Sequence, residues 1–449
     1  MSAFDVNGMR VTVAGAARSG IAASALLAGR GAKVTLSDTR AEAGDAEPLK
    51  KLGVDLELGG HKTETFTGAD LIVTSPGVPP DQPAIAAAKA HGVPVIGELE
   101  LASRFLRGRM VAITGTKGKS TTTELTGRVL EAAGFKVTVG GNVGVPLSSQ
   151  VAGSTPETVH VVEASSFQLE QTETFHPWIA VMLNFSPDHL DRHPSVDAYG
   201  AAKARIFERQ EAGDWKVINA DDPGVLRLSR HGRARSRFFA KDTALESGTV
   251  IEEGWIVDRA TARTTKLVPL DAIHLLGPHL VNDVMAAATV GVIAGAAPAA
   301  MTAAVDAFEG LEHAMELVAE IGGVKFVNDS KATNVDAALH SIESFASGLV
   351  PIIGGRFKGG DLRLLREPLK RRARAVVAIG EAAPLVKEAL EGAVDVRMAG
   401  AFDEAVKQAF ALAKPDGVVL LAPACASFDM FRDYADRGRR FKEEVRRLR

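Results

Sequence analysis

One short segment constrains this chain more than any other: Gly-Thr-Lys-Gly-Lys-Ser-Thr at residues 115–121. It follows an apolar stretch, Met110 to Thr114, that is typical of a buried strand, and a helical pattern from Ser120 to Ala133 comes next. Glycines let the backbone curl so that several N–H groups face a phosphate, and the helix N-terminus adds partial positive charge. The segment therefore predicts a phosphate-binding loop between a strand and a helix of an α/β domain.

Each residue type in this loop has a use in binding a nucleoside triphosphate. Lys119 would reach the terminal phosphates, and the Ser120 hydroxyl would bind magnesium. The match is to a shortened pattern, because Ile113 stands where the broad pattern has a glycine. The alternative is a glycine-rich turn with incidental lysines. The predicted ATP-binding residues of the loop are Gly115, Thr116, Lys117, Gly118, Lys119, Ser120 and Thr121.

Strand and helix patterns alternate along the whole chain, which predicts an α/β fold with mostly parallel sheets. The pattern divides into three segments, residues 1–97, 98–310 and 311–449, which we take as three domains. The strands expected from apolar runs are residues 11–14, 33–37, 71–74 and 93–96 in the first segment, 110–114, 159–162 and 179–183 in the second, and 324–327, 350–353, 375–379 and 418–421 in the third.

A second glycine-rich turn, Gly15 to Gly20, follows the first expected strand, and Asp38 ends the next one. This order is a nucleotide-binding pattern, but Ala17 stands in place of its middle glycine. The turn alone leaves open a dinucleotide-dependent oxidoreductase or an ordinary turn between a strand and a helix.

Charge and cysteine content limit the partners and the compartment. The net charge is −3 without a long run of one sign, which disfavours nucleic acid or an anionic membrane as the main partner. Cys425 is the one cysteine, so a disulfide within the chain is impossible, as suits a reducing cytosol. Residues 1–5 lack the features of a signal peptide, and we expect a cytoplasmic protein.

The stretch from Val284 to Val305 has no charged residue and needs a check for membrane character. It is mostly alanine, and Gly291, Gly295 and Pro298 interrupt it. Such breakers predict two buried helices with a turn between them rather than a membrane span.

Further motifs follow the phosphate loop in order along nearly the whole chain. They are Gly140–Gly144, Glu163–Leu169 (Glu-Ala-Ser-Ser-Phe-Gln-Leu), Asn184–His193, Ala202–Lys203, Asn328–Asn334 (Asn-Asp-Ser-Lys-Ala-Thr-Asn) and Pro423–Asp429. Together with the loop, these motifs resemble the Mur ligases, and within that family the ligases that add D-glutamate. The Ser-Ser-Phe-Gln and Asn-Asp-Ser-Lys-Ala-Thr-Asn runs distinguish that branch.

The resemblance implies an ATP-dependent ligase that joins UDP-N-acetylmuramoyl-L-alanine to D-glutamate in peptidoglycan precursor synthesis. A carboxylate is a poor electrophile, and the family activates it as an acyl phosphate before the amine attacks, so cations must surround the phosphoryl group. The implied fold has a Rossmann-like N-terminal domain for the UDP substrate, a central P-loop domain for ATP and a Rossmann-like C-terminal domain for glutamate. ATP and Mg²⁺ are the implied cofactors, in a monomer whose domains close around the ligands.

The resemblance also assigns residues. It implies that Ser120, Glu163 and His189 bind magnesium and that Lys203 is carbamylated by carbon dioxide, giving a further oxygen ligand. Without the resemblance, Lys203 would be interpreted as a surface lysine on a helix. The implied catalytic residues are Lys119, Lys203, His189 and Glu163; the nucleotide contacts outside the loop are Asn282, His313 and Asp329; the contacts to the UDP substrate are Arg18, Ser19, Asp38, Thr39, Ser75, Pro76, Gly77, Asn142, Ser165 and Gln168; the glutamate contacts are Thr333, Lys358, Ser427 and Tyr434.

The chain departs from the family pattern near the nucleotide and the glutamate. Lys117 stands where many relatives have asparagine, and it adds a cation to the loop. Glu312 and Ala314 flank His313 where proline and arginine are common, which puts one ATP contact in doubt. Tyr434 replaces a phenylalanine.

Two other classes of function remain open. A sister ligase could add another amino acid, or glutamate to a folate, although the residues assigned to glutamate disfavour it. A nucleotide-switched binding protein without ligase chemistry would use the same phosphate loop.

Overall fold

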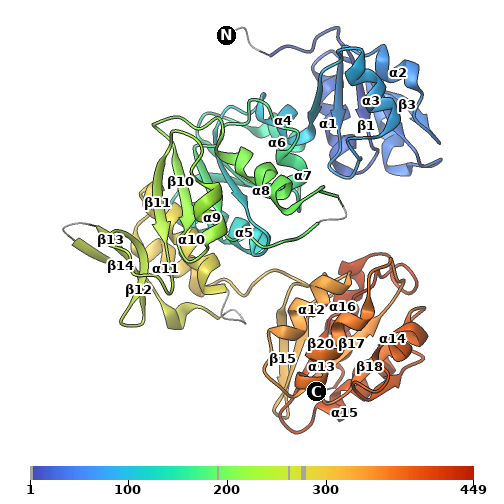
Figure 1. Cartoon of the computed structure of the whole chain (residues 1–449), viewed down its shortest axis with the longest axis vertical. Helices are drawn as coiled ribbons and strands as arrows, with labels where there is room; N and C mark the ends of the chain where they lie inside the picture. Colours follow the sequence, from blue (N-terminus) through green and yellow to red (C-terminus); the bar gives the residue numbers. More distant parts are fainter. Residues whose placement is uncertain (1–3, 190–191, 261–262, 275–279, 449) are drawn as a thin grey trace. The chain divides into compact units, whose positions relative to one another are not determined.

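The chain folds into three α/β domains, each built on its own β-sheet (Figure 1). The computed structural model describes residues 4–189, 192–260, 263–274 and 280–448. The first two sheets belong to one compact unit and the third to another, and the units separate after Phe308. The predicted fold class is confirmed, while the domain boundaries at residues 97/98 and 310/311 stay a prediction.

The first domain has a parallel sheet with the order β3-β2-β1-β4-β5 over the described residues. Strand β1 directs Val11 and Val13 into a core shared with Leu27 of α1. A Cβ atom at Gly20 would lie 1.8 Å from the carbonyl oxygen of Gly15, so the turn into α1 needs glycine there. The elements are β1 (Arg10–Ala14), α1 (Arg18–Gly29), β2 (Lys33–Asp38), η1 (Gly44–Leu52), β3 (Asp55–Leu58), α2 (Thr63–Thr67), β4 (Leu71–Thr74), α3 (Pro83–Ala90), β5 (Val95–Gly97) and α4 (Glu98–Ser103).

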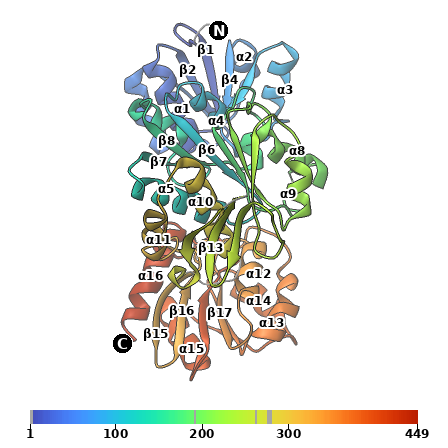
Figure 2. The ribbon, with the colours of Figure 1, turned by 90° about the vertical axis from the view of Figure 1, so that its left-hand side faces the viewer.

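The second domain has the sheet order β14-β13-β12-β11-β10-β9-β6-β8-β7 in the described part of the chain. Strands β7 to β12 of this order are parallel, whereas β12, β13 and β14 pair antiparallel at one edge. Figure 2 shows α5 and α8 on opposite sides of β6. The strands are β6 (Arg109–Thr114), β7 (Lys136–Gly141), β8 (Thr158–Glu163), β9 (Ile179–Met182), β10 (Trp215–Asn219), β11 (Arg235–Phe239), β12 (Gly248–Glu252), β13 (Trp255–Ala260) and β14 (Arg263–Pro269). The helices are α5 (Lys119–Ala132), α6 (Leu147–Gln150), η2 (Val151–Gly153), α7 (Ser166–Leu169), α8 (Val196–Ala204), η3 (Arg205–Phe207), α9 (Pro223–Leu228), η4 (Leu270–Ala272), α10 (Leu280–Ala294) and α11 (Pro298–Asp306).

The uncharged alanine-rich stretch forms α10 and α11, which both pack against α5 (Figure 1). Gly295, at φ +83°, ends the first helix, and Pro298 starts the second. This confirms the predicted helix pair. None of the helices in the described residues combines the length and apolar character needed to cross a membrane.

The third domain has the sheet order β15-β16-β20-β17-β18-β19, as far as the described residues extend. Among the described strands of this sheet, β15 at one edge is antiparallel to its neighbour and the others are parallel. Buried helix residues cover both faces of the sheet, with Leu369 on one face and Phe441 on the other. The elements are β15 (Glu316–Ile321), β16 (Val324–Asn328), α12 (Val335–Glu343), β17 (Leu349–Gly354), η5 (Leu362–Leu365), α13 (Arg366–Arg372), β18 (Val376–Ile379), α14 (Ala383–Leu390), β19 (Val396–Met398), α15 (Phe402–Ala413), β20 (Val418–Leu421) and α16 (Tyr434–Arg446).

Candidate active site

The phosphate loop connects β6 to α5 as the sequence predicts. Gly115 and Gly118 have φ values of +155° and +79°, which glycine adopts without strain. Lys119 starts α5, and its Nζ donates hydrogen bonds to the carbonyl oxygens of Gly115 at 3.1 Å and Thr116 at 2.9 Å. The lysine therefore folds back over the loop at the positive end of the helix, a site suited to phosphate.

Asn184 holds the loop from the end of the neighbouring strand β9, and the sequence had assigned it no role. Its Oδ1 accepts the amide hydrogens of Thr116 at 3.0 Å and Lys117 at 2.8 Å. Its Nδ2 donates to the carbonyl oxygen of Lys117 at 3.1 Å. These contacts fix the loop backbone ahead of the first turn of α5.

Lys203 is buried beside the same loop, so its interpretation as a surface lysine is wrong. Its side chain is 1% exposed, and its Nζ donates to the carbonyl oxygen of Gly115 at 2.7 Å. Burial, and then the charge of Lys119, lower the pKa of Lys203 well below its usual value of 10.5. The amine is thereby biased toward its neutral form, the form that can react with carbon dioxide.

Tyr199 connects Lys203 to the loop, and the sequence had not assigned it to the site either. Its ring lies 4.6 Å from Nζ of Lys203, and its hydroxyl lies 3.3 Å from Oγ1 of Thr116. Burial raises the pKa of Tyr199 to about 12, so the phenol stays protonated. The aromatic ring and the loop together enclose the amine.

Glu163 ends β8, the other neighbour of β6, and is 3% exposed. Its Oε1 accepts a hydrogen bond from Nδ2 of Asn142 at 2.9 Å. The structure thus brings together two residues that were predicted separately, one for magnesium and one for the substrate. Both lie at the carboxyl ends of strands beside the phosphate loop, where α/β sheets bind ligands.

His189 is exposed on the segment after β9, with an uncommon φ of +53°. The carboxylate of Asp188 accepts its backbone N–H at 2.8 Å, and its ring centroid lies 5.0 Å from that of Phe167. Leu190 and Asp191 of the same motif lie outside the described residues.

A magnesium site here would need ligands of several kinds. In the part of the chain that the structure describes, no three His, Cys, Asp or Glu side chains group closely enough to hold a metal. Glu163 and His189 would therefore need help from the Ser120 hydroxyl and a modified Lys203, as the family resemblance implies.

Ser165 and Gln168 form a capping box at the start of α7. Oε1 of Gln168 accepts hydrogen bonds from the amide and the hydroxyl of Ser165, each at 3.0 Å. Nε2 of Gln168 is buried and has no hydrogen-bond partner among the described residues. That amide nitrogen is the part of Gln168 available to a ligand.

The residues assigned to the UDP substrate in the first domain lie at the carboxyl ends of β1, β2 and β4. Oγ of Ser75 donates to the carbonyl oxygen of Gly15 at 3.0 Å, so the two turns support each other. Burial alone would raise the pKa of Asp38, but hydrogen bonds from Arg40 and from the amide of Ala16 lower it to about 2. Ser19 and Pro76 are half-buried, and Thr39 and Gly77 are exposed.

Arg18 crosses to the central domain, where its Nη2 donates to the carbonyl oxygen of Gly144 at 2.6 Å. Gly144 follows Asn142 in the loop after β7. The contact joins the predicted UDP site to the predicted path of the muramoyl-alanine arm.

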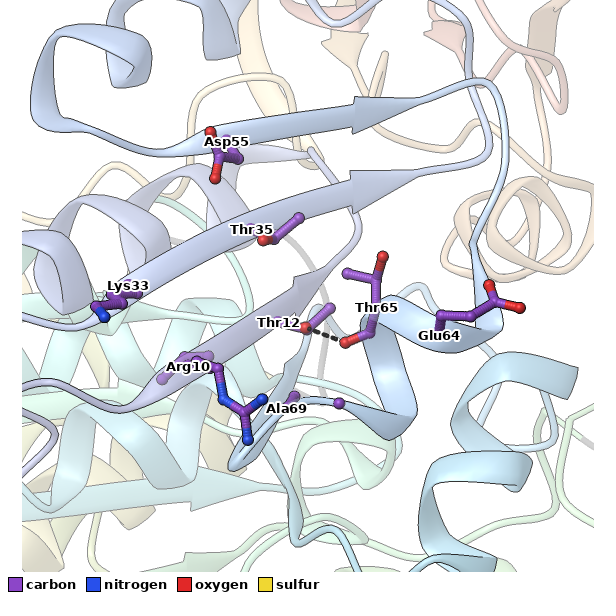
Figure 3. Close-up of a pocket in the computed structure, with 10 residues that line it drawn as sticks. Arg10, Thr12, Lys33, Thr35, Asp55, Glu64, Thr65 and Ala69 are labelled. Carbon is purple, nitrogen blue, oxygen red and sulfur yellow. Dashed lines mark hydrogen bonds between the residues drawn. The ribbon is translucent and has the colours of Figure 1, made fainter.

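A pocket of about 330 Å³ lies elsewhere in the first domain, between α2 and the starts of β1, β2 and β3 (Figure 3). Thr12 and Thr35 line it from adjacent strands, and Oγ1 of Thr12 donates to the carbonyl oxygen of Thr65 at 3.1 Å. It opens at the amino ends of the strands, whereas the predicted substrate residues follow the carboxyl ends. No residue assigned to a ligand lines it.

Asn282 and Asp283 lie in the first turn of α10, next to the phosphate loop. Oγ1 of Thr122 donates to Oδ1 of Asp283 at 3.1 Å, and the Asp283 carboxyl group packs against Gly118. Oδ1 of Asn282 is buried without a hydrogen-bond partner among the described residues. The sequence predicted a nucleotide role for Asn282 but none for Asp283.

His313 and Asp329, the predicted nucleotide contacts of the third domain, lie in neighbouring segments. His313 is buried at φ +65°, and its Nδ1 lies 2.9 Å from Nδ2 of Asn328. Burial lowers the pKa of His313 and raises that of Asp329. The Asp329 carboxylate accepts hydrogen bonds from the Ser341 hydroxyl and from the amide of Met315.

The segments predicted to bind glutamate converge at the carboxyl ends of β16, β17 and β20. Ala426 and Arg356 exchange two backbone hydrogen bonds, which brings the Ser427 segment to the Lys358 segment. The amide of Ala424 donates to the carbonyl oxygen of Ala332, next to Thr333. Ser427 is buried, Thr333 is half-buried, and Lys358 and Tyr434 are exposed.

Arg437 connects the segments that carry Thr333 and Ser427 through hydrogen bonds. The sequence had assigned it no role. It is buried and donates hydrogen bonds to the Ser330 hydroxyl, the Ser330 carbonyl and the Cys425 carbonyl at 2.9–3.1 Å. The Ser330 hydroxyl in turn donates to the carbonyl oxygen of Tyr434 at 2.7 Å.

Comparisons with known proteins identify the family of the chain. The Mur ligase MurD-like N-terminal domain matches residues 9–97, the Mur ligase middle domain residues 113–291, and the Mur ligase glutamate ligase domain residues 313–425. UDP-N-acetylmuramoylalanine--D-glutamate ligase from Acidobacterium capsulatum is 47% identical over 98% of this chain and 97% of its own. The protein of the same name from Koribacter versatilis is 44% identical over 99% of both chains.

Solved structures share the fold at low sequence identity. UDP-N-acetylmuramate-alanine ligase MurC from Thermotoga maritima has a TM-score of 0.60 at 19% identity, over 98% of this chain and 100% of that one. MurF ligase from the same organism, solved in complex with ADP, has a TM-score of 0.58 at 17% identity, over 99% and 96%. With matched domains along its length and relatives this similar, the chain belongs to the Mur ligase family.

Proposed function

We propose that this chain joins UDP-N-acetylmuramoyl-L-alanine to D-glutamate through an amide bond, with hydrolysis of ATP to ADP and phosphate. The observation that carries the proposal is the convergence of Lys119 and Lys203 on the carbonyl oxygen of Gly115 beside Glu163. Two amines and a carboxylate at a phosphate loop suit phosphoryl transfer to an acid group. The relatives named for this reaction, 42–47% identical over nearly the whole chain, support the choice of substrates.

The reaction has two steps, phosphorylation of the alanine carboxylate and formation of the amide. An oxygen of the alanine carboxylate attacks the γ-phosphorus of ATP, the bond to the β–γ bridging oxygen breaks, and ADP leaves. The neutral amine of glutamate then attacks the acyl carbon, the bond from that carbon to the phosphate oxygen breaks, and the proton lost by the amine ends on the released phosphate as the amide forms. Lys119 and the loop amides stabilise the charge on the transferring phosphoryl group, which is the main task of a protein in such reactions.

The residues around the loop suit magnesium. The carboxylate of Glu163 is buried, and its hydrogen-bond partner among the described residues is the neutral Asn142 amide. No salt bridge to Glu163 is formed among the described residues, and a buried carboxylate in that state favours a bound cation. Ser120, Glu163, His189 and a carbamylated Lys203 would hold the metal, which when bound would screen charge between the phosphates and the carboxylate.

The glutamate would bind in the third domain. Lys358 supplies a positive charge for a carboxylate, and Thr333 and Ser427 supply hydroxyl donors. Arg437 keeps the segments that carry Thr333 and Ser427 in place, because its hydrogen bonds reach Ser330 and Cys425. We further propose a cytoplasmic monomer, in keeping with the single buried cysteine, Cys425.

One ligation assay tests the proposal. Purified protein, ATP, magnesium and UDP-N-acetylmuramoyl-L-alanine are offered D-glutamate, L-glutamate or another amino acid, and the product mass and released phosphate are measured. We expect one phosphate per amide with D-glutamate and none in Lys119→Ala. Product with another amino acid only would favour a sister ligase, and phosphate release without amide would refute ligase chemistry.

A further inference from the structure

The carboxyl group of Asp283 lies directly against Gly118 of the phosphate loop. It is so close that no residue with a side chain fits at position 118. A Cβ atom built on Gly118 would come 2.2 Å from Oδ1 of Asp283 and 3.1 Å from Oδ2. Gly118 also has a φ of +79° and immediately precedes α5. The start of the phosphate-binding helix and the start of α10 are therefore in contact through this acid.

The Asp283 side chain is buried and only partly hydrogen-bonded. It is 3% exposed, and its Oδ1 accepts the hydroxyl of Thr122 at 3.1 Å. Its Oδ2 has no hydrogen-bond partner among the described residues. A buried, half-satisfied carboxylate is unfavourable, whereas the neutral acid is tolerated. Burial accordingly raises the pKa of Asp283 to about 8, against a smaller opposing effect of Thr122.

The charged side chains on the elements around Asp283 do not offset the effect of burial on its pKa. Lys216 is bonded to the carbonyl oxygens of Ser229 and His231. Arg237 pairs with Asp258, and Arg128 pairs with Glu124. Among the described residues, burial and the Thr122 hydroxyl are the influences on the Asp283 carboxyl, and neither is a charged group. The charged residues on the loop and on the elements packed against α10 are Lys117, Lys119, Glu124, Arg128 and Glu131 (loop and α5), Lys216 (β10), Arg235 and Arg237 (β11), Glu252 (β12), Asp258 and Arg259 (β13) and Asp306 (α11).

A triphosphate at this loop and an ionised Asp283 would compete. Both are anions, and both would be drawn to the partial positive charge at the start of α5. Their repulsion is strong because the acid is shielded from water. We propose that Asp283 is a positioning residue that must be protonated when the loop accepts a nucleoside triphosphate, so that binding takes up a proton at this carboxyl group.

This inference rests on the proposed function only in that the loop binds ATP. The proton comes from solvent and ends on the Asp283 carboxylate, and no other bond changes. The sign follows from linkage: the affinity for ATP is highest below about pH 8, where the acid already has its proton, and falls as the pH rises.

The test is the pH dependence of ATP binding, measured by titration calorimetry in the presence of magnesium. Wild type should bind about thirtyfold more weakly at about pH 9.5 than at about pH 7, because Asp283 loses its proton between these values. Asp283→Asn keeps the shape and an oxygen acceptor for Thr122 but cannot ionise, so its affinity should change less than about twofold over that range. Glu131→Gln, which removes an exposed charge near the far end of α5, should behave as wild type.

Equal loss of affinity in wild type and Asp283→Asn would overturn the inference while leaving ATP binding intact. A second measurement on wild type alone covers a variant that fails to fold. Binding heats at about pH 8.5 in two buffers of different ionisation enthalpy should reveal uptake of a substantial fraction of one proton. No uptake would overturn the inference, and no ATP binding at any pH would refute the proposed function as well.

Discussion

Replacing Asn184 by alanine tests whether the phosphate loop is held in place before a nucleotide arrives. The change removes three side-chain hydrogen bonds, at 2.8, 3.0 and 3.1 Å, to the backbone of Thr116 and Lys117. The bond from the Thr116 amide to the Asn184 carbonyl oxygen remains, since it belongs to the backbone. The loop would therefore lose its local order but keep its connection to β9.

The expected effect follows from the number of bonds and their exposure. Each contributes about 1 kcal/mol net, and water can replace part of the loss at the exposed Lys117. About 2 kcal/mol of loop ordering would then have to come from nucleotide binding, which weakens the affinity for ATP about thirtyfold.

Asn219→Ala is the matched control. Asn219 ends β10, the strand beside β9, and its Nδ2 donates to the carbonyl oxygen of Leu183 at 2.9 Å rather than to the phosphate loop. ATP affinity by calorimetry and the free energy of unfolding in urea would be measured for both variants. Both should lose stability, but only Asn184→Ala should lose affinity. Wild-type affinity in Asn184→Ala, or an equal loss in Asn219→Ala, would refute the reasoning.

Three further changes have definite expectations. Lys203→Ala should abolish ligation, and wild-type activity should rise with added bicarbonate; equal wild-type activity in carbon-dioxide-free buffer would count against carbamylation. Gly20→Ala places a Cβ atom 1.8 Å from the Gly15 carbonyl oxygen, so binding of the UDP substrate should weaken at least about tenfold while calorimetry shows unchanged ATP affinity. Tyr434→Phe keeps the ring contact with His313, so KM for glutamate should change less than about twofold, and a tenfold rise would show that the hydroxyl binds substrate.

The parts of the fold that the sequence predicted correctly depend on local signals. Strands such as Leu71–Thr74 and Val418–Leu421 are short apolar runs between turns, and the structure has both with the predicted bounds. The helix pair α10 and α11 was also predictable, because Gly295 and Pro298 end one helix and begin the next.

The antiparallel edge of the central sheet was not predicted. Strands β12 and β13 connect through Glu253 and Gly254, which have φ values of +46° and +78°. Such a turn usually has asparagine or aspartate before the glycine, so glutamate gave no hairpin signal.

The site residues that the sequence did not identify are recognised by contacts between distant parts of the chain. Asn184 reaches a loop 67 and 68 residues earlier, and Asp283 contacts Thr122 across 161 residues. Neither contact produces a periodic pattern of residues that could be recognised in the sequence. Asp283 adjoins the uncharged stretch that begins at Val284, and an acid beside such a stretch was a signal that could have been followed.

The chemistry of the loop depends on how one carbonyl oxygen is shared. Both Lys119 and Lys203 donate to Gly115, and two full positive charges at such a short separation repel each other. Burial and the charge of Lys119 together favour loss of the proton from Lys203. A neutral amine held against Gly115 and the Tyr199 ring can then accept carbon dioxide, after which its position beside the loop would carry negative charge. The same pair of lysines would thus supply one group that attracts phosphate and one that attracts a metal ion, because burial favours loss of the proton from Lys203.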